Sequence, residues 1–257
     1  MRTLMLKALI VLLLFIAAGY SPAFATAAPQ DTVATQSMSV AQLEKAGDAC
    51  RAQKNYEQAI KYFKEALRQD KKNAKLYNKM GLAELSLGDY ADARADFSRA
   101  TKYDRSYPEA WNDLGVVAYL QQNYPQAIRY FQKAIALDES RASFHVNLGL
   151  TWFTQNNMDN AMREYTRALD LDPDALMRSS NTALSAQIAT REQRAKQDFM
   201  LAEIFAKMGY VDSCLLCLKK AKEDGYTNLA KVYKEDEFAR VRQDVRLATI
   251  VPPPETK

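Results

Sequence analysis

A single interval of 34 residues recurs through the middle of this chain of 257 residues. Four glycines keep it: Gly47, Gly81, Gly115 and Gly149. Three further columns share the register, one of alanines, one of aromatic residues and a second of alanines: Ala59, Ala93, Ala127 and Ala161; Phe63, Phe97, Phe131 and Tyr165; Ala66, Ala100, Ala134 and Ala168. Chance does not align four columns, so we expect a stack of equivalent units in which each contacts mainly its neighbours.

With the glycine at position eight, four units follow one another without a gap: 40–73, 74–107, 108–141 and 142–175. Each unit predicts two helices. In the third, Pro108 stands at a helix start, where its missing N–H costs nothing, and apolar residues follow at helical spacing. Asn123 is placed to cap the second helix, with Gln126 three residues further on. Ser39 and Gln42 predict the same kind of cap before the first unit.

The repeated columns have a packing explanation. Glycine at position eight and alanine at position twenty leave little bulk where the two helices of a unit cross, and the ring at position twenty-four fills the space beside them. We therefore expect a larger residue at Gly115 to overpack that crossing. Helices this short are marginal alone, so the units must be stabilised by packing on each other.

The composition excludes several classes of function. The chain holds 8 Gly, 3 Cys and one His, so Gly-rich phosphate loops, a His/Cys zinc site and a Ser-His-Asp triad are all disfavoured. The net charge is +4, and it falls by two to about +2 if an N-terminal segment with Arg2 and Lys7 is removed. A net charge this small does not indicate a basic surface that binds nucleic acid. We expect no catalytic residue, no metal, no cofactor and no nucleic-acid partner.

The N-terminus has the pattern of a secretory signal peptide over residues 1–25. Two positive charges precede an apolar run at 8–18, and Ala23-Phe24-Ala25 offers a cleavage point after Ala25. The run is shorter than the ~20 residues that span a bilayer, so an uncleaved anchor is less favoured and no stable membrane span is expected after cleavage. Residues 26–39 are polar and without periodicity, which predicts a flexible linker. We expect a periplasmic or secreted protein.

The third unit carries Trp-x-x-Leu-Gly at 111–115, followed by Ala127, Phe131 and Ala134, and Pro173 stands near the end of the fourth. In these residues and in its 34-residue period the chain resembles the tetratricopeptide repeat family. Position four varies between units, and only the fourth has proline at position thirty-two. The resemblance implies an all-α fold, a right-handed solenoid of helix-turn-helix units with four regular repeats.

Beyond Ala175 the register is lost. Residues 176–194 contain many Ser and Thr residues and predict a loop. The register returns at 195–228, with Cys214 at position twenty, which predicts a divergent fifth repeat. Residues 229–251 suggest two or three short helices, which the resemblance implies would cap the end of the solenoid, and 252–257 predict a disordered tail.

The resemblance also implies where a partner binds. In this family, positions two, five, nine, twelve and thirteen of the first helices line a concave groove that holds a peptide or a helix of another protein. Carried onto this sequence, ten of these positions form the candidate site: Asn78, Leu82, Leu85, Asn112, Val116, Tyr119, Leu120, Val146, Leu150 and Phe153. The apolar cluster among them is suited to anchor a hydrophobic segment.

The favoured function is a non-enzymatic protein-interaction scaffold of the periplasm or cell envelope. One branch of the family binds chaperones, and its groove holds a C-terminal carboxylate between Lys, Asn and Arg side chains. Glu44 and Asp48 stand where that clamp begins with Lys and Asn, so a carboxylate would be repelled. A co-chaperone function is therefore rejected. The oligomeric state is left open.

Several alternatives stay open beside this function. Cys214-Leu-Leu-Cys217 could serve thiol redox chemistry, although it lies within a helix, in a packing column. A glycan or another small ligand could be held by Asn78, Asn112 and Tyr119. The groove could also be covered by residues 176–192 or by the C-terminal helices.

Two further features favour a structural role. His145 falls in the packing column at position four, so a satisfied, partly buried side chain is expected rather than a catalytic base. Asp170, Asp172 and Asp174 alternate as in a calcium loop, but Pro173 interrupts them and no downstream Glu completes the loop. These carboxylates are expected to end one helix and cap the next.

Overall fold

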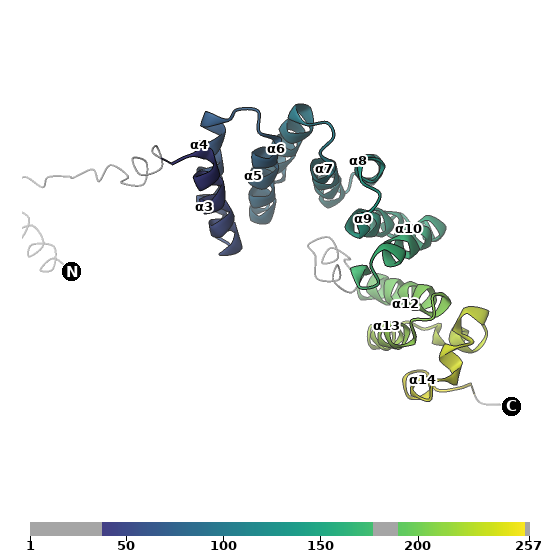
Figure 1. The fold of residues 1–257 in the computed structure, drawn as a ribbon. Helices are drawn as coiled ribbons and strands as arrows, with labels where there is room; N and C mark the ends of the chain where they lie inside the picture. The colour runs from purple at the N-terminus through teal and green to yellow at the C-terminus, as the bar shows by residue number, and fades with distance from the viewer. Residues whose placement is uncertain (1–37, 177–189, 255–257) are drawn as a thin grey trace, which may run out of the picture. The chain divides into compact units, whose positions relative to one another are not determined.

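The computed structural model describes residues 38–176 and 190–254. The predicted signal segment 1–25 and nearly all of the linker 26–39 lie outside these residues. Within them, four helix pairs follow one another along the chain (Figure 1). The pairs are α3 (Val40–Ala52) with α4 (Tyr56–Gln69), α5 (Ala74–Leu87) with α6 (Tyr90–Tyr103), α7 (Pro108–Leu120) with α8 (Tyr124–Leu137), and α9 (Ala142–Thr154) with α10 (Met158–Leu171). The described part contains no strand, which confirms the predicted all-α fold.

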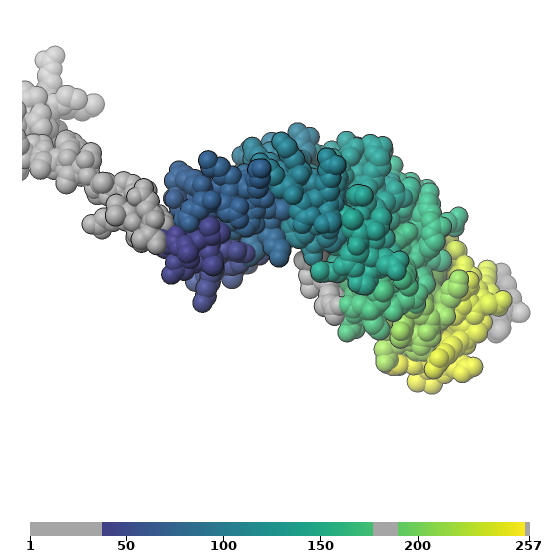
Figure 2. Space-filling view, turned by 45° about the horizontal axis from the view of Figure 1, so that its top comes forward, coloured from purple at the N-terminus to yellow at the C-terminus, as the bar shows by residue number. Residues whose placement is uncertain are grey.

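Each helix packs against the helix that precedes it and the helix that follows it. We call α3, α5, α7 and α9 the first helices of units one to four, and α4, α6, α8 and α10 the second helices. The space-filling view shows neighbouring units in contact from the purple N-terminal pair onward (Figure 2). The core of this part is therefore a row of helix interfaces, as expected for repeated units that contact mainly their neighbours.

Every unit contains the same contact between a glycine and an aromatic ring. A Cβ atom built on Gly115 would lie 2.5 Å from Cε1 of Phe131, and Cβ atoms built on the glycines of the other three units would lie 2.5–2.8 Å from their rings. The four rings are Phe63, Phe97, Phe131 and Tyr165, and each is fully or almost fully buried. The expectation that glycine at position eight makes room for the ring at position twenty-four is confirmed.

The turn between the two helices of a unit also repeats. The residue at position fifteen has a left-handed backbone in all four units, with φ between 57° and 85°. Only the second unit places glycine there; the four residues are Lys54, Gly88, Gln122 and Asn156. Gly209 has φ 79° and takes the same position in the predicted fifth unit. The helix pair thus requires a left-handed residue that the sequence supplies with glycine in only some units.

The helix caps agree with the expected pattern at the first unit. The Ser39 hydroxyl accepts from the Gln42 amide, and the Gln42 side chain accepts from the Ser39 amide. Asn123 caps α8 by accepting from the Gln126 amide at 3.3 Å. The Gln126 side chain does not return to the cap, because its oxygen accepts from Arg129 instead.

The chain resumes with α12 (Arg191–Lys207), which packs against α13 (Val211–Glu223). This corrects the expected loop over 176–194, because α12 begins at Arg191. The reason is a cap: the Thr190 hydroxyl accepts from the Gln193 amide at 3.1 Å, which fixes the helix start. Positions eight, twenty and twenty-four of this pair are Ala202, Cys214 and Leu218, and none of them has measurable exposure.

Four short helices complete the described chain: η2 (Leu229–Tyr233), η3 (Asp236–Phe238), η4 (Val241–Gln243) and α14 (Arg246–Ile250). They pack on α12 and α13 and bury Val232, Phe238, Val241 and Leu247. Phe199 of α12 stacks on Tyr226 with ring centroids 4.3 Å apart. These contacts cover apolar side chains of the last helix pair, as a terminal segment of a repeat stack must do.

We predict that Gly115→Ala lowers the free energy of unfolding by about 1–3 kcal/mol, because the buried Phe131 ring must move away from the new methyl group. The higher helix propensity of alanine, about 1 kcal/mol, offsets only part of this loss. Urea unfolding followed by circular dichroism measures it. Combining Gly115→Ala with Phe131→Leu should cost less than the sum of the two single changes. Strict additivity would show that this ring is not the obstacle.

Candidate functional site on the first helices

Side chains of neighbouring first helices bond to each other at one constant spacing. Lys79 Nζ donates to Glu44 Oε1 at 2.6 Å, which joins units one and two. Asn78 Nδ2 donates to Asp113 Oδ2 at 2.9 Å between units two and three. Asn147 Nδ2 donates to Asn112 Oδ1 at 2.9 Å between units three and four. All three bonds join position five of one unit to position six of the next, a separation of 35 residues.

These bonds define a continuous surface, which we call the first-helix face. It is the side of α3, α5, α7 and α9 that carries positions five, nine and twelve. A fourth bond of the same spacing, between the hydroxyl groups of Tyr119 and Thr154 at 3.0 Å, joins positions twelve and thirteen of α7 and α9. The predicted site did not include position six. The sequence does carry a pattern for it, because the residues at position five of one unit and position six of the next have side chains that can bond to each other.

The ten predicted site residues divide by burial. Six are buried: Asn78, Asn112, Tyr119, Val146, Leu150 and Phe153. Four are half-buried: Leu82, Leu85, Val116 and Leu120. The expected apolar cluster is therefore split between these two groups. Tyr119, Leu150 and Phe153 belong to the hydrophobic core that extends through α12 and α13, and the accessible apolar surface lies on Leu82, Leu85, Val116 and Leu120. Whether residues 177–189 cover the face lies outside the described residues.

Asp113 is the centre of the polar bonding on this face. Its two carboxylate oxygens accept from the amides of Asn78 and Asn112 at 2.9 and 3.1 Å. Burial raises the pKa of Asp113 to about 6, although both amides act against that rise by stabilising the carboxylate. Asn78 is only 3% exposed, and among the described residues its Oδ1 has no hydrogen-bond partner. One carboxylate thus joins two asparagines of neighbouring units, Asn78 of unit two and Asn112 of unit three.

Glu44 and Asp48, at the N-terminal end of the first-helix face, repel a ligand carboxylate less than the sequence suggests. Lys79 Nζ lies 2.6 Å from Glu44 and 2.5 Å from Asp48. Burial lowers the pKa of Lys79, but the hydrogen bonds to both carboxylates outweigh it, so the pKa is raised and the lysine stays charged. Arg51 lies 3.9 Å from Asp48 Oδ1 as well, so two cations accompany the two carboxylates of this cluster. A ligand carboxylate finds no unpaired cation there.

The alternative of a glycan or another small ligand relied on Asn78, Asn112 and Tyr119. All three are buried, and each already bonds to another side chain of the protein. Their polar groups are thus used in joining units. Nothing in their geometry favours a glycan over a protein segment.

The cysteines are placed for packing. Cys214 and Cys217 lie on one face of α13 and are buried, and both are free thiols. Burial raises the pKa of each thiol to about 12. The thiolate is the reactive form of cysteine, so these side chains lack the activation that a redox or nucleophilic role requires.

His145 and the aspartates after it have structural partners. His145 is buried, with Nδ1 2.8 Å from Glu164 Oε2 and Nε2 3.3 Å from the Glu139 carbonyl oxygen, so both ring nitrogens are occupied. Asp172 is the C-cap of α10, and its Oδ1 accepts from the Asp174 amide. Within the described residues, no group of three His, Cys, Asp or Glu side chains is arranged to hold a metal ion. None of the described helices is long and apolar enough to cross a membrane.

A buried pair of carboxyl groups, which sequence reasoning missed, lies between α5 and α6. Glu84 is 5% exposed and Asp96 is 2% exposed, and their side chains share a hydrogen bond. Burial and the neighbouring Asp96 raise the pKa of Glu84 to about 8. Burial also raises the pKa of Asp96, but the hydrogen bond from Arg99 acts against that rise. Glu84 therefore carries the shared proton at neutral pH. The two residues stand on different helices, at positions whose other occupants are not acidic pairs, so no sequence pattern marked them.

We predict that this pair makes the free energy of unfolding fall as the pH rises from about 5 to about 8. In that window folded Glu84 keeps a proton that the unfolded chain releases. Glu84→Gln cannot ionise and should donate to Asp96, so the variant should exceed the wild type by about 1–3 kcal/mol near pH 8 and by little near pH 5. Urea midpoints at both pH values measure this. Glu57→Gln, at an exposed site, serves as the control, and an equal pH response in the wild type and Glu84→Gln would contradict the assignment.

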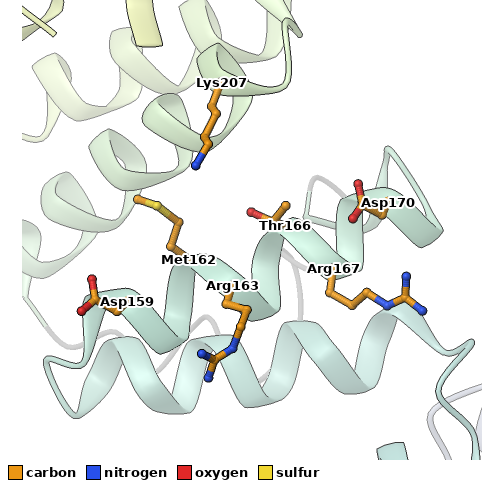
Figure 3. Close-up of a pocket in the computed structure, with 7 residues that line it drawn as sticks. All are labelled: Asp159, Met162, Arg163, Thr166, Arg167, Asp170 and Lys207. Carbon is orange, nitrogen blue, oxygen red and sulfur yellow. The ribbon is translucent and has the colours of Figure 1, made fainter. Parts of the chain in front are cut away.

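A cleft of about 480 Å³ lies away from the first-helix face, between α10 and the end of α12. Met162 and Thr166 project from α10 toward Lys207, while Arg163 and Arg167 extend from the other side of the same helix (Figure 3). Asp159 and Asp170 stand at the two ends of α10. None of these residues belongs to the predicted site.

Comparison with known proteins identifies the units. A family model described as tetratricopeptide repeat matches residues 78–142 and 121–175, and a second, described as TPR repeat, matches 47–88. Together the matches run from residue 47 to residue 175, just over half of the chain. No curated protein matches this sequence.

Solved structures show the same fold. A structure of TTC0263, a thermophilic TPR protein in Thermus thermophilus, covers 80% of this chain and 98% of its own at 20% identity, with a TM-score of 0.51. A structure of the MamA protein covers 77% of this chain and 95% of its own at 22% identity, with a TM-score of 0.50. The repeated glycine–ring contacts, the paired helices and the matching family models lead to one conclusion: the chain belongs to the tetratricopeptide repeat family.

Proposed function

We propose that this protein is a non-enzymatic scaffold that binds a segment of a partner protein on the first-helix face. The observation that carries the proposal is the partly exposed apolar surface of Leu82, Leu85, Val116 and Leu120, on consecutive first helices beside a row of polar bonds. Apolar side chains framed by fixed polar groups suit a partner helix or an extended peptide. The membership in a family of interaction modules supports this function.

The side chains in the described part of the chain favour binding over catalysis. The cysteines are buried with raised pKa values, both nitrogens of the single histidine are occupied, and the carboxyl groups of the first-helix face are bonded to amides or to Lys79. The thiols are too buried and too weakly acidic for nucleophilic catalysis, and the histidine and these carboxyl groups are already held by hydrogen bonds or ion pairs. The face instead offers shape, apolar contact and hydrogen-bonding groups.

We test the face by photo-crosslinking in cells that produce the protein. A photoreactive phenylalanine analogue placed at Leu82 or Leu120 should form a discrete adduct with a partner protein. The same analogue at Leu87 serves as the control, because Leu87 is 41% exposed on α5 but points away from positions five, nine and twelve. Adducts of equal yield from all three positions, or from Leu87 alone, would remove the first-helix face as the binding surface.

We further propose that this scaffold works in the periplasm or cell envelope. The proposal rests on the signal pattern of residues 1–25, with its apolar run and its Ala-Phe-Ala site. Fractionation of the producing cells followed by N-terminal sequencing should give a mature chain that starts at Thr26. Recovery of the chain with Met1 in the cytoplasmic fraction would refute the location. Substituting Ala23 and Ala25 by large residues should block processing and leave the longer chain.

A further inference from the structure

Two arginines on α10 belong to a pattern that the preceding unit shares. Arg163 and Arg167 take positions twenty-two and twenty-six of unit four, and Arg129 and Lys133 take the same positions of unit three. Arg129 donates to Gln126, and Arg163 donates to Asn160, the residue in the matching position. The second helices of units three and four, α8 and α10, thus carry cations at the same two positions.

Unit four differs because a third cation, Lys207, lies across the cleft from α10, on the side to which Met162 and Thr166 project. Lys207 is the last residue of α12, and its side chain extends toward Met162 and Thr166 across the cleft (Figure 3). Within the described part of the chain, neither Lys207 nor Arg167 forms an ion pair. The cleft therefore has cations on two rims, with a thioether and a methyl group between them.

The two acidic residues of the cleft do not neutralise its middle. Asp159 lies in the first turn of α10 and Asp170 in its last turn, which separates them by about 16 Å along the helix axis. Arg167 and Lys207 border the stretch between them, whereas Arg163 is paired with Glu164, with Nε 3.9 Å from Oε1. A negatively charged group in the middle of the cleft thus meets cations before it meets a carboxylate.

We propose that this cleft binds an acidic segment of a partner protein, at a site separate from the first-helix face. Its volume of about 480 Å³ accommodates a few residues of an extended chain. The cations are spread along α10 and across to Lys207 rather than converging on one point, which suits several carboxylates on a peptide better than a single small anion. Met162 supplies an adaptable apolar contact for one side chain of that peptide.

The probe is a short fluorescein-labelled peptide of glutamate and leucine, with a peptide of lysine and leucine for comparison, measured by fluorescence anisotropy on the whole mature chain. The wild type should bind the acidic peptide and not the basic one. Arg167→Glu with Lys207→Glu should weaken binding of the acidic peptide by about tenfold or more. Arg129→Glu with Lys133→Glu changes the net charge equally, on the equivalent positions of unit three, and should have less than about a twofold effect.

The charge-reversed variant also shows whether a loss of binding results from misfolding. Arg167→Glu with Lys207→Glu should gain affinity for the basic peptide, whereas a damaged protein would bind neither peptide. Equal loss of acidic-peptide binding in both double variants would overturn the proposal, because the effect would then follow net charge alone. Absence of wild-type binding, or cleft-dependent binding only to vesicles that contain phosphatidylglycerol, would overturn it as well. Charged substitutions at Leu82 and Leu120 should leave this binding unchanged, which separates it from the proposed scaffold function.

Discussion

The contact between a glycine and an aromatic ring sets the geometry from which the rest of the structure follows. In each of the four units, a helix backbone without a side chain lies against a buried ring of the partner helix. This contact fixes how closely the two helices approach and how they are rotated against each other. Because the same pair recurs every 34 residues, successive units present equivalent surfaces to one another. A stack, rather than a closed globule, is the natural result.

The bonds between first helices depend on that regularity. Position five meets position six of the next unit at three junctions in succession, through an ion pair, an amide–carboxylate bond and an amide–amide bond. The same arrangement of first helices therefore accommodates three different kinds of polar bond. Each neutral bond contributes about 0.5–1.5 kcal/mol and a charged one more, so the junctions add to stability without requiring one fixed residue type. The surface beside them, with Leu82 and Leu120, is held in place by the same bonds.

Sequence patterns predicted the framework better than the site. The glycine and ring columns specify helix pairs directly, because each column reports a contact inside one unit. Burial of Tyr119 and Phe153 depends instead on what lies against position twelve from other units, which a repeat pattern does not contain. The start of α12 was missed because the single Thr190 cap is weaker than a periodic signal. The Glu84–Asp96 pair arises only when two helices meet, so no local sequence feature marks it.

The left-handed residue at position fifteen shows which part of a unit determines the rest. Three of the four regular units place Lys54, Gln122 or Asn156 there, although this conformation costs a residue with a side chain about 1–2 kcal/mol. The packing of the two helices is strong enough to impose the turn on Lys54 and Gln122, which do not prefer it, whereas Asn156 adopts it more readily. Helix packing therefore determines the conformation of the turn, rather than the turn determining how the helices pack. The turns are accordingly where the repeats can diverge in sequence while the array keeps its form.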